Sequence, residues 1–274
     1  MASPQDPLIK RLTRIKKSDI LEILVAGLSV SPEAVQKLDK KDLILHCSKE
    51  LRAAAGSSTA NVFRDDHDFP YKQLLIDVAD KLTPGHTIFS WTDYTMDDDH
   101  SVEEIEDAIV KIFEERTKKW WMNLSAEEKA EFTKGIKNAA DPDEVKSVAG
   151  TGAVKSFLTQ QVIENIIQGG IMSGLGKVGA GGVMGAVGVS LVAKIGWLVV
   201  LQTVGWMSGV KFLAFGVAGH GAMGGAVAGV GGLVVGGVLS IPTLFALVDG
   251  AAYRKTVPTV ILLLTKYRLA KAAS

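Results

Sequence analysis

Residues 212–248 form 37 consecutive positions without a formally charged side chain. A helix needs about 20 mostly apolar residues to cross a bilayer, so this stretch is long enough for two crossings. Upstream, between Asn165 and residue 211, only Lys177, Lys194 and Lys211 are charged. A soluble protein of this length could not easily bury so much apolar surface. The sequence therefore predicts that this region is embedded in a membrane.

Glycine spacing in the same region is typical of close helix packing. Of the 29 glycines in the chain, 23 lie between Gly169 and Gly250. Several are four residues apart, which places both on one helix face, where backbones can approach closely in lipid. The predicted packing glycines are Gly181, Gly185, Gly221, Gly225, Gly229, Gly232 and Gly236. A flexible linker is excluded because the intervening residues are apolar. A buried hairpin within a soluble bundle, as in colicin-like toxins, is the remaining alternative.

Three stretches are predicted to be transmembrane: Val178–Val200, Phe212–Gly231 and Gly232–Val248. The last two can also join as one long helix or form a re-entrant hairpin. Lysine is costly at the bilayer centre, so such a side chain either extends to an interface or faces an aqueous lumen. If the helices assemble around an axis, the lumen-facing candidates are Lys194, Lys211 and His220.

Charge divides the chain into two parts. Residues 1–150 contain 21 Lys and Arg and 28 Asp and Glu, whereas residues 151–274 contain 9 and 2. This asymmetry predicts different surroundings, with a cytoplasmic helical domain at 1–150 and a membrane domain at 151–274. A closing helix is predicted over 251–272, and Pro258 is expected to kink it or to begin its second part. The cations predicted to anchor it at the cytoplasmic face are Arg254, Lys255, Lys266, Arg268 and Lys271.

The polar half reads as helical throughout, so the predicted fold is all-α. Phe69-Pro70-Tyr71 is expected to begin one helix, and another over 32–55 is expected to break near residues 38–42. Two capping boxes, Ser101 to Glu104 and Ser125 to Glu128, predict the starts of two further helices. Trp120 and Trp121 follow on the first of these, where they could stack on bases, anchor at a membrane or pack in the core.

Five cations lie within eight residues near the N-terminus, namely Lys10, Arg11, Arg14, Lys16 and Lys17. Such a cluster can neutralise phosphates of an oligonucleotide or of lipid headgroups. A solvated basic face is the simpler interpretation, and the sequence leaves the three open. Because residues 1–17 lack an apolar core, no secretory signal peptide is expected and the polar half should be cytoplasmic.

No catalytic or metal-binding pattern emerges from the sequence. The acidic run 97–99 beside His100 could hold a cation, but no second cluster has ligand spacing. The five histidines form no zinc motif, and neither a Walker A sequence nor a nucleophile elbow occurs. Cys47 is the only cysteine, so no intrachain disulfide can form. We therefore expect a protein that is not an enzyme and has no metal and no cofactor.

Several segments occur in an order that resembles a known bacterial family. They are residues 71–82, the Trp pair, SAEEKAEF at 125–132, the Gly-rich region and AYRKTVPTV at 252–260. Together they are similar to the YaaW-like family, which carries the label "ubiquinol–cytochrome c chaperone domain". Members also resemble the channel-forming subunit of Hailong-type antiphage defence systems. In those systems a nucleotidyltransferase partner makes short DNA oligomers that hold the channel closed.

The resemblance and the residues together set the expected function. We expect a homo-oligomeric channel of the cytoplasmic membrane, consistent with a tetramer, whose cytoplasmic helices bind a nucleotide or short single-stranded DNA. The alternative is a membrane-associated chaperone or assembly factor that conducts no ions. A neighbouring nucleotidyltransferase gene would favour the channel, and respiratory genes would favour the chaperone.

Overall fold

The computed structural model describes residues 6–56, 69–83, 96–139, 159–170, 199–200 and 251–272. Within these ranges the chain is helical and contains no strand, which confirms the predicted all-α class for this part. None of the helices described there is both long enough and apolar enough to cross a membrane. The three predicted spans lie outside the described residues, apart from Val199 and Val200.

The chain divides into two compact units whose bounds differ from the ranges expected from charge. The first unit comprises Met1–Arg116 together with Ala246–Ser274, and the second comprises Thr117–Phe245. The C-terminal segment, expected to belong to a membrane domain, is therefore part of the unit formed by the N-terminal helices. Charge composition could not reveal this return of the chain, because it follows from tertiary packing.

The N-terminal helices of the first unit begin and end at recognisable signals. Helix α1 (Pro7–Arg14) has proline at its first position, and the Asp6 carboxylate accepts a hydrogen bond from the Leu8 amide at 2.8 Å. Helix α2 (Lys17–Glu22) continues into a single π-helical turn, η1 (Ile23–Gly27). Helix α3 (Pro32–Val35) ends before α4 (Lys40–Gly56), which confirms the break expected near residues 38–42.

Two further helices follow, and the second of them continues past Arg116 into the second unit. Helix α5 (Tyr71–Leu82) begins at the residue expected from its Phe-Pro-Tyr signal. Helix α6 (Val102–Asn123) begins at the predicted capping box, where the Ser101 amide donates to Glu104 at 2.7 Å. The Glu104 amide donates in turn to the Ser101 hydroxyl at 3.2 Å, which satisfies a second free amide of the first turn.

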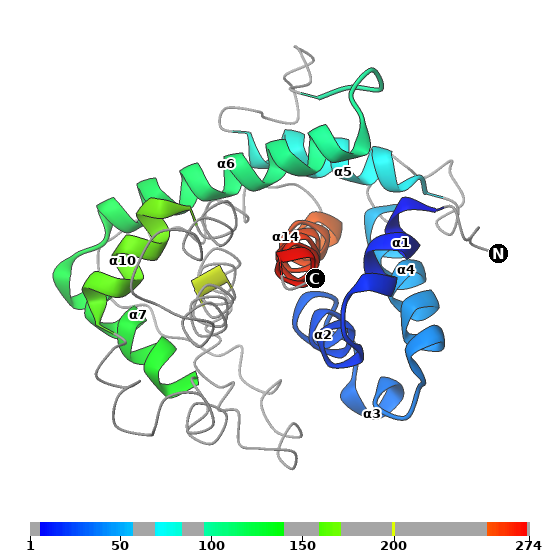
Figure 1. The fold of residues 1–274 in the computed structure, drawn as a ribbon, viewed down its shortest axis with the longest axis horizontal. Helices are drawn as coiled ribbons and strands as arrows, with labels where there is room; N and C mark the ends of the chain where they lie inside the picture. The colour runs from blue at the N-terminus through cyan, green and yellow to red at the C-terminus, as the bar shows by residue number, and fades with distance from the viewer. Residues whose placement is uncertain are drawn as a thin grey trace. The chain divides into compact units, whose positions relative to one another are not determined.

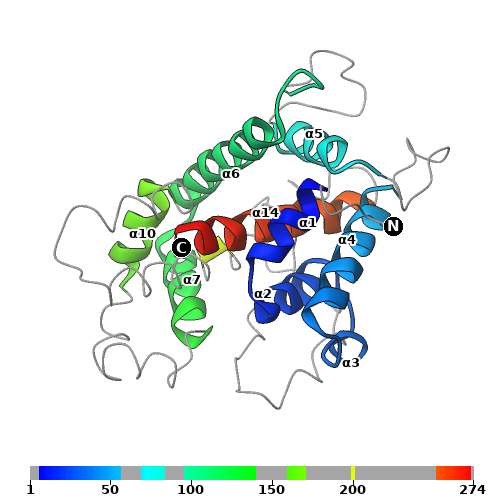
Figure 2. The ribbon, with the colours of Figure 1, turned by 45° about the vertical axis from the view of Figure 1, so that its right-hand side comes forward.

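Helix α14 (Ala251–Ala272) lies at the centre of the first unit and has the predicted bounds. It packs against α4, η1, α5 and α1, and Figures 1 and 2 show these helices around it. Every residue from Thr256 to Thr265 is buried, as expected for a helix segment that is uncharged and mostly apolar on all sides. Pro258 lies inside the helix rather than at its end.

The second unit has its own aromatic core near the end of α6. After Asn123, helix α7 (Ala126–Ala139) begins at the second predicted capping box, where the Ser125 amide donates to Glu128 at 2.8 Å. Phe132 packs edge-to-face on Trp120 and Trp121, with ring centroids 5.2 and 5.6 Å apart. The structure thus places both tryptophans in the core. Helix α10 (Gln160–Gly169) packs against α7.

Candidate anion-binding surface

The cationic surface forms on α1 because the helix is strongly amphipathic. Leu8 and Leu12 are buried on one face and Ile15 is buried just after the helix ends. Lys10 and Arg14, four residues apart, are exposed on the opposite side. Lys16 lies in the turn before α2, and Lys17 is the first residue of α2, both exposed. Four of the five predicted cations are therefore available to solvent.

Arg11 differs from the other four cations because it is part of the core and only 5% exposed. Its guanidinium donates to Glu106 of α6 through Nε at 2.7 Å and through Nη2 at 3.2 Å. The same Nη2 donates to Glu103 at 2.6 Å. The Tyr71 hydroxyl also donates to Glu106, at 2.9 Å. Two carboxylates already neutralise Arg11, so its role is to fasten α1 to α6.

The ionisation of this cluster follows from its contacts. Burial lowers the pKa of Arg11, but the hydrogen bonds to Glu106 and Glu103 outweigh it and the net pKa is raised. The hydrogen bond from Arg11 holds the pKa of Glu103 below its ordinary value. Burial, reinforced by the Glu106 charge, raises the pKa of Tyr71 well above its ordinary value. At neutral pH, Arg11 and Glu103 are therefore charged and Tyr71 is a neutral hydrogen-bond donor.

A second arginine ties the beginning of α1 to α4. Arg52 is buried, and its guanidinium forms an ion pair with Asp6, the residue that caps α1. It also donates to the Phe69 carbonyl oxygen and, through Nε, to the Ser48 hydroxyl at 3.3 Å. Charge-assisted bonds of this kind are stronger than neutral ones. Helix α1 is thus fixed at its beginning through Asp6 and at its middle through Arg11, which gives the exposed cations a defined position.

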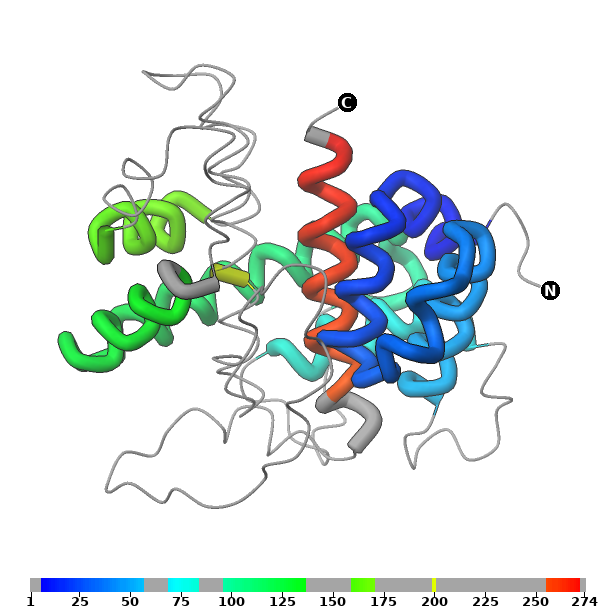
Figure 3. The backbone as a smooth tube through the Cα atoms, turned by 90° about the horizontal axis from the view of Figure 1, so that it is seen from below, coloured from blue at the N-terminus to red at the C-terminus, as the bar shows by residue number. Residues whose placement is uncertain are grey.

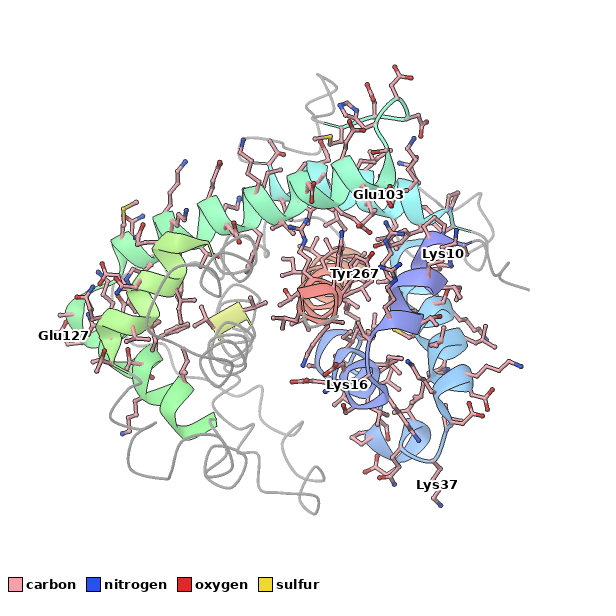
Figure 4. All side chains as sticks on the ribbon, in the orientation of Figure 1. Lys10, Lys16, Lys37, Glu103, Glu127 and Tyr267 are labelled. Atoms are coloured by element: carbon pink, nitrogen blue, oxygen red, sulfur yellow. The ribbon has the colours of Figure 1, made fainter. Side chains whose placement is uncertain are left out.

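A shallow hollow of about 420 Å³ lies beside these cations and is lined by side chains from α1, α6 and α14. The lining residues are Ile9, Lys10, Arg11, Thr13, Arg14, Glu103 and Tyr267. The guanidinium carbons of Arg11 and Arg14 lie 5.5 and 6.0 Å from the centre of the Tyr267 ring. Figure 4 labels Lys10, Glu103 and Tyr267 around this region.

The hollow combines positive charge with an aromatic ring. Of its three cations, Lys10 and Arg14 are exposed, whereas Arg11 is held by carboxylates. Phosphate oxygens suit the two exposed cations, and a planar base suits the ring of Tyr267. Tyr267 was not among the residues predicted from sequence. It carries no local signal, since only the packing of α14 brings it beside α1, and Glu103 and Glu106 were missed for the same reason.

The remaining predicted site residues lie elsewhere. The pore candidates Lys194, Lys211 and His220 lie outside the described residues, as do all seven packing glycines. In the acidic turn, Asp97 accepts a hydrogen bond from the Asp99 amide at 3.0 Å and lies 2.7 Å from His100 Nδ1. Over the described ranges, no group of three or more His, Cys, Asp or Glu side chains is arranged to hold a metal ion.

Comparison with known proteins gives no relative from which a function could be inferred. No family model, curated protein or solved structure matches the chain. The features that bear on function are therefore the described residues of α1 and α14 and the sequence of the Gly-rich region.

Proposed function

We propose that the protein is a membrane channel whose first unit binds an anionic nucleotide or short single-stranded DNA. The observation that carries this proposal is the position of Tyr267. This residue of α14 lines the same hollow as Lys10 and Arg14 of α1. A ligand bound there contacts the helix that follows the Gly-rich apolar region directly in the chain.

Coupling between ligand and membrane region follows from this arrangement. A ligand shifts a conformational equilibrium only by its difference in affinity for the two states. A ligand that contacts both α1 and α14 favours the state in which the two helices hold their present spacing. Because α14 begins at Ala251, immediately after the apolar region, a change in its position is transmitted along the backbone to that region.

The conducting part is assigned to the Gly-rich region. Its glycine spacing favours close helix packing within lipid, and packing between copies of the chain produces a homo-oligomer. Lys194, Lys211 and His220 are the polar side chains that would line an aqueous lumen along its axis. The bilayer of the cytoplasmic membrane is then the first partner of the chain, and no enzymatic step is required.

The binding half of the proposal is tested with fluorescently labelled short single-stranded DNA. The double variant Lys10→Glu/Arg14→Glu should weaken binding at least about tenfold and reduce the slope of log affinity against log salt by about 1.4, for two phosphate contacts. Lys37→Glu/Lys49→Glu, which changes the net charge equally at two exposed sites on the same unit outside the hollow, is the matched control and should bind as the parent does. Equal binding by all three proteins would exclude the α1 surface.

The conducting half is tested in planar bilayers with the purified protein. We expect the parent protein to conduct a current that the DNA oligomer changes. The Lys10→Glu/Arg14→Glu variant should conduct a current that the oligomer leaves unchanged. Absence of conductance with and without oligomer would refute the channel. In that case membrane association without current would favour the chaperone or assembly factor.

A further inference from the structure

The chain leaves the first unit after Arg116 and returns to it at Ala246, and most of the Gly-rich region lies in between. The first unit contains the chain up to Arg116 and again from Ala246 to its end. Everything between Thr117 and Phe245, including most of the charge-free stretch that begins at residue 212, is an insertion between these two parts. The return segment is α14, so the strength of its attachment decides whether the two parts can separate.

Helix α14 is a largely buried element of the first unit. It packs against α1, η1, α4 and α5, and Figure 3 shows it running beside the N-terminal helices. Its ten central residues from Thr256 to Thr265 are buried. Because burial of apolar side chains stabilises a fold, removing α14 would expose apolar side chains of the helices that it contacts and destabilise this unit.

One contact shows how closely α14 approaches its neighbours. A Cβ atom added at Gly27 of η1 would lie 2.5 Å from the Thr259 hydroxyl oxygen and 3.1 Å from the Thr259 Cα. The absence of a side chain at Gly27 therefore permits the backbones of η1 and α14 to meet at this point. Such an approach requires η1 and α14 to fold together.

Ion pairs fix the C-terminal part of α14 to neighbouring helices. Lys266 lies 3.0 Å from Asp19 and 2.8 Å from Glu22, both on α2, and its side chain is largely buried. Arg268 forms an ion pair with Asp107 of α6. These partners are separated from α14 by about 150 residues or more in the sequence, yet all belong to the first unit. A largely buried lysine that lost both carboxylates would be strongly destabilising.

Helix α14 is not itself a membrane span. Its uncharged buried run covers only ten positions, and cations flank the run at Lys255, Lys266, Arg268 and Lys271. A crossing helix needs about 20 mostly apolar residues. The apolar character of α14 is accounted for by its burial among the helices of the first unit.

We propose that the inserted region crosses the bilayer an even number of times, so that α1–α6 and α14 lie on the same side. This inference rests on the membrane location put forward above. An odd number of crossings would place α14 across the bilayer from α1, α4 and α5 and would separate Lys266 from Asp19 and Glu22. The cations of α14 agree with the cytoplasmic side, because Lys and Arg concentrate in short cytoplasmic segments.

An even number of crossings is compatible with only some combinations of the three predicted spans. Three complete crossings by Val178–Val200, Phe212–Gly231 and Gly232–Val248 are excluded. Two crossings remain, either with one in Val178–Val200 and the return within residues 212–248, or with both within residues 212–248 as a hairpin. In the first arrangement, residues 212–248 provide 37 residues where one span needs about 20, and the surplus enters and leaves on one face or extends the return helix.

Single-cysteine labelling tests this topology. The only native cysteine, Cys47, is buried, and burial together with the Glu50 charge raises its pKa to about 12, so it should remain unlabelled in the folded protein. Cysteine is introduced at the exposed positions Lys37 on the first unit or Lys271 on α14. A membrane-impermeant maleimide is applied to spheroplasts and to inverted membrane vesicles.

The two sites should behave alike, labelled in inverted vesicles and protected in spheroplasts. Labelling of Lys271→Cys in spheroplasts with protection of Lys37→Cys would overturn the even count while the membrane location stands. Recovery of the protein in the aqueous supernatant would instead overturn the membrane location and the inference together. Labelling of both sites in spheroplasts would retain the even count and reverse the cytoplasmic assignment.

A charge exchange provides an independent readout in membranes. Lys266→Glu should loosen α14 from α2 and increase the labelling rate of Cys47 at least about fivefold, because α4 packs against α14. Combining Lys266→Glu with Asp19→Lys and Glu22→Lys restores opposite charges at this contact, so the triple variant should label Cys47 as slowly as the parent does. If α14 lay across the bilayer, Lys266→Glu would leave the labelling rate of Cys47 unchanged. The triple variant would then label Cys47 at the same rate as well.

Discussion

Replacing Glu106 by Gln should destabilise the first unit far more than the same change at Glu103, although both carboxylates contact Arg11. The Glu106 side chain is 6% exposed and that of Glu103 is 72% exposed. In Glu106→Gln, a single amide oxygen would have to accept from both Arg11 and Tyr71, and the buried guanidinium would keep only the exposed Glu103 as a charged partner. Breaking a buried pair in this way costs about 3–5 kcal/mol, whereas an exposed pair contributes about 0–1 kcal/mol.

The free-energy difference converts into a measurable temperature shift. For a unit of about 150 residues, each kcal/mol lowers Tm by about 3 °C, so Glu106→Gln should lower it by about 9–15 °C and Glu103→Gln by no more than about 3 °C. A fluorogenic maleimide that reacts with Cys47 on unfolding reports this unit specifically, because no other thiol is present. The assay also works in detergent.

Similar shifts for the two variants would refute the reasoning, since burial would then not decide the strength of the pair. A repair variant tests the same reasoning from the other side. Arg11→Met, Tyr71→Phe and Glu106→Leu together remove the buried ion pair and the hydroxyl that donates to it, and such apolar replacement is often neutral or stabilising. The triple variant should therefore melt well above Glu106→Gln.

Three further predictions follow from single contacts. Gly27→Ala should cost about 1–3 kcal/mol by overpacking against Thr259, while Gly169→Ala, at the end of α10 with nothing within 4 Å, should not lower stability in circular dichroism melts. Ser101→Ala should lower stability by about 1 kcal/mol in the same melts by removing the α6 cap. The third concerns pH: because the Arg11 hydrogen bond lowers the folded-state pKa of Glu103, its stabilisation is present above the ordinary value of 4.5 and lost as pH falls through the folded pKa. The Tm advantage of the parent over Glu103→Gln should accordingly shrink in melts below pH 4.5, and an advantage that stayed the same well below that pH would contradict this.

Local signals predicted much of the helical order because their causes are local. Proline, capping boxes and 3.6-residue periodicity specify where a helix begins, and α5, α6, α7 and α14 begin where these signals predicted. The break between α3 and α4 was likewise visible in the sequence. Such signals act over a few residues and require no knowledge of tertiary structure.

The tertiary relations were not predictable in this way. The apolar run of α14 follows the Gly-rich region, and its flanking cations resemble membrane anchors, so sequence alone assigned it to a membrane domain. Packing instead encloses it among helices far away in the sequence and pairs Lys266 with Asp19 and Glu22. Arg11 was similarly grouped with exposed cations, since only tertiary structure reveals Glu106 beneath it.

Extraction of membranes from expressing cells tests the central claim most directly, namely that the Gly-rich region is solvated by lipid. Carbonate at alkaline pH strips peripheral proteins and leaves integral ones in the pellet. The account predicts that the full-length chain stays in the carbonate-washed pellet and enters solution only with detergent. A chain that instead remained in the supernatant, monodisperse without detergent, would contradict the membrane location and the channel with it.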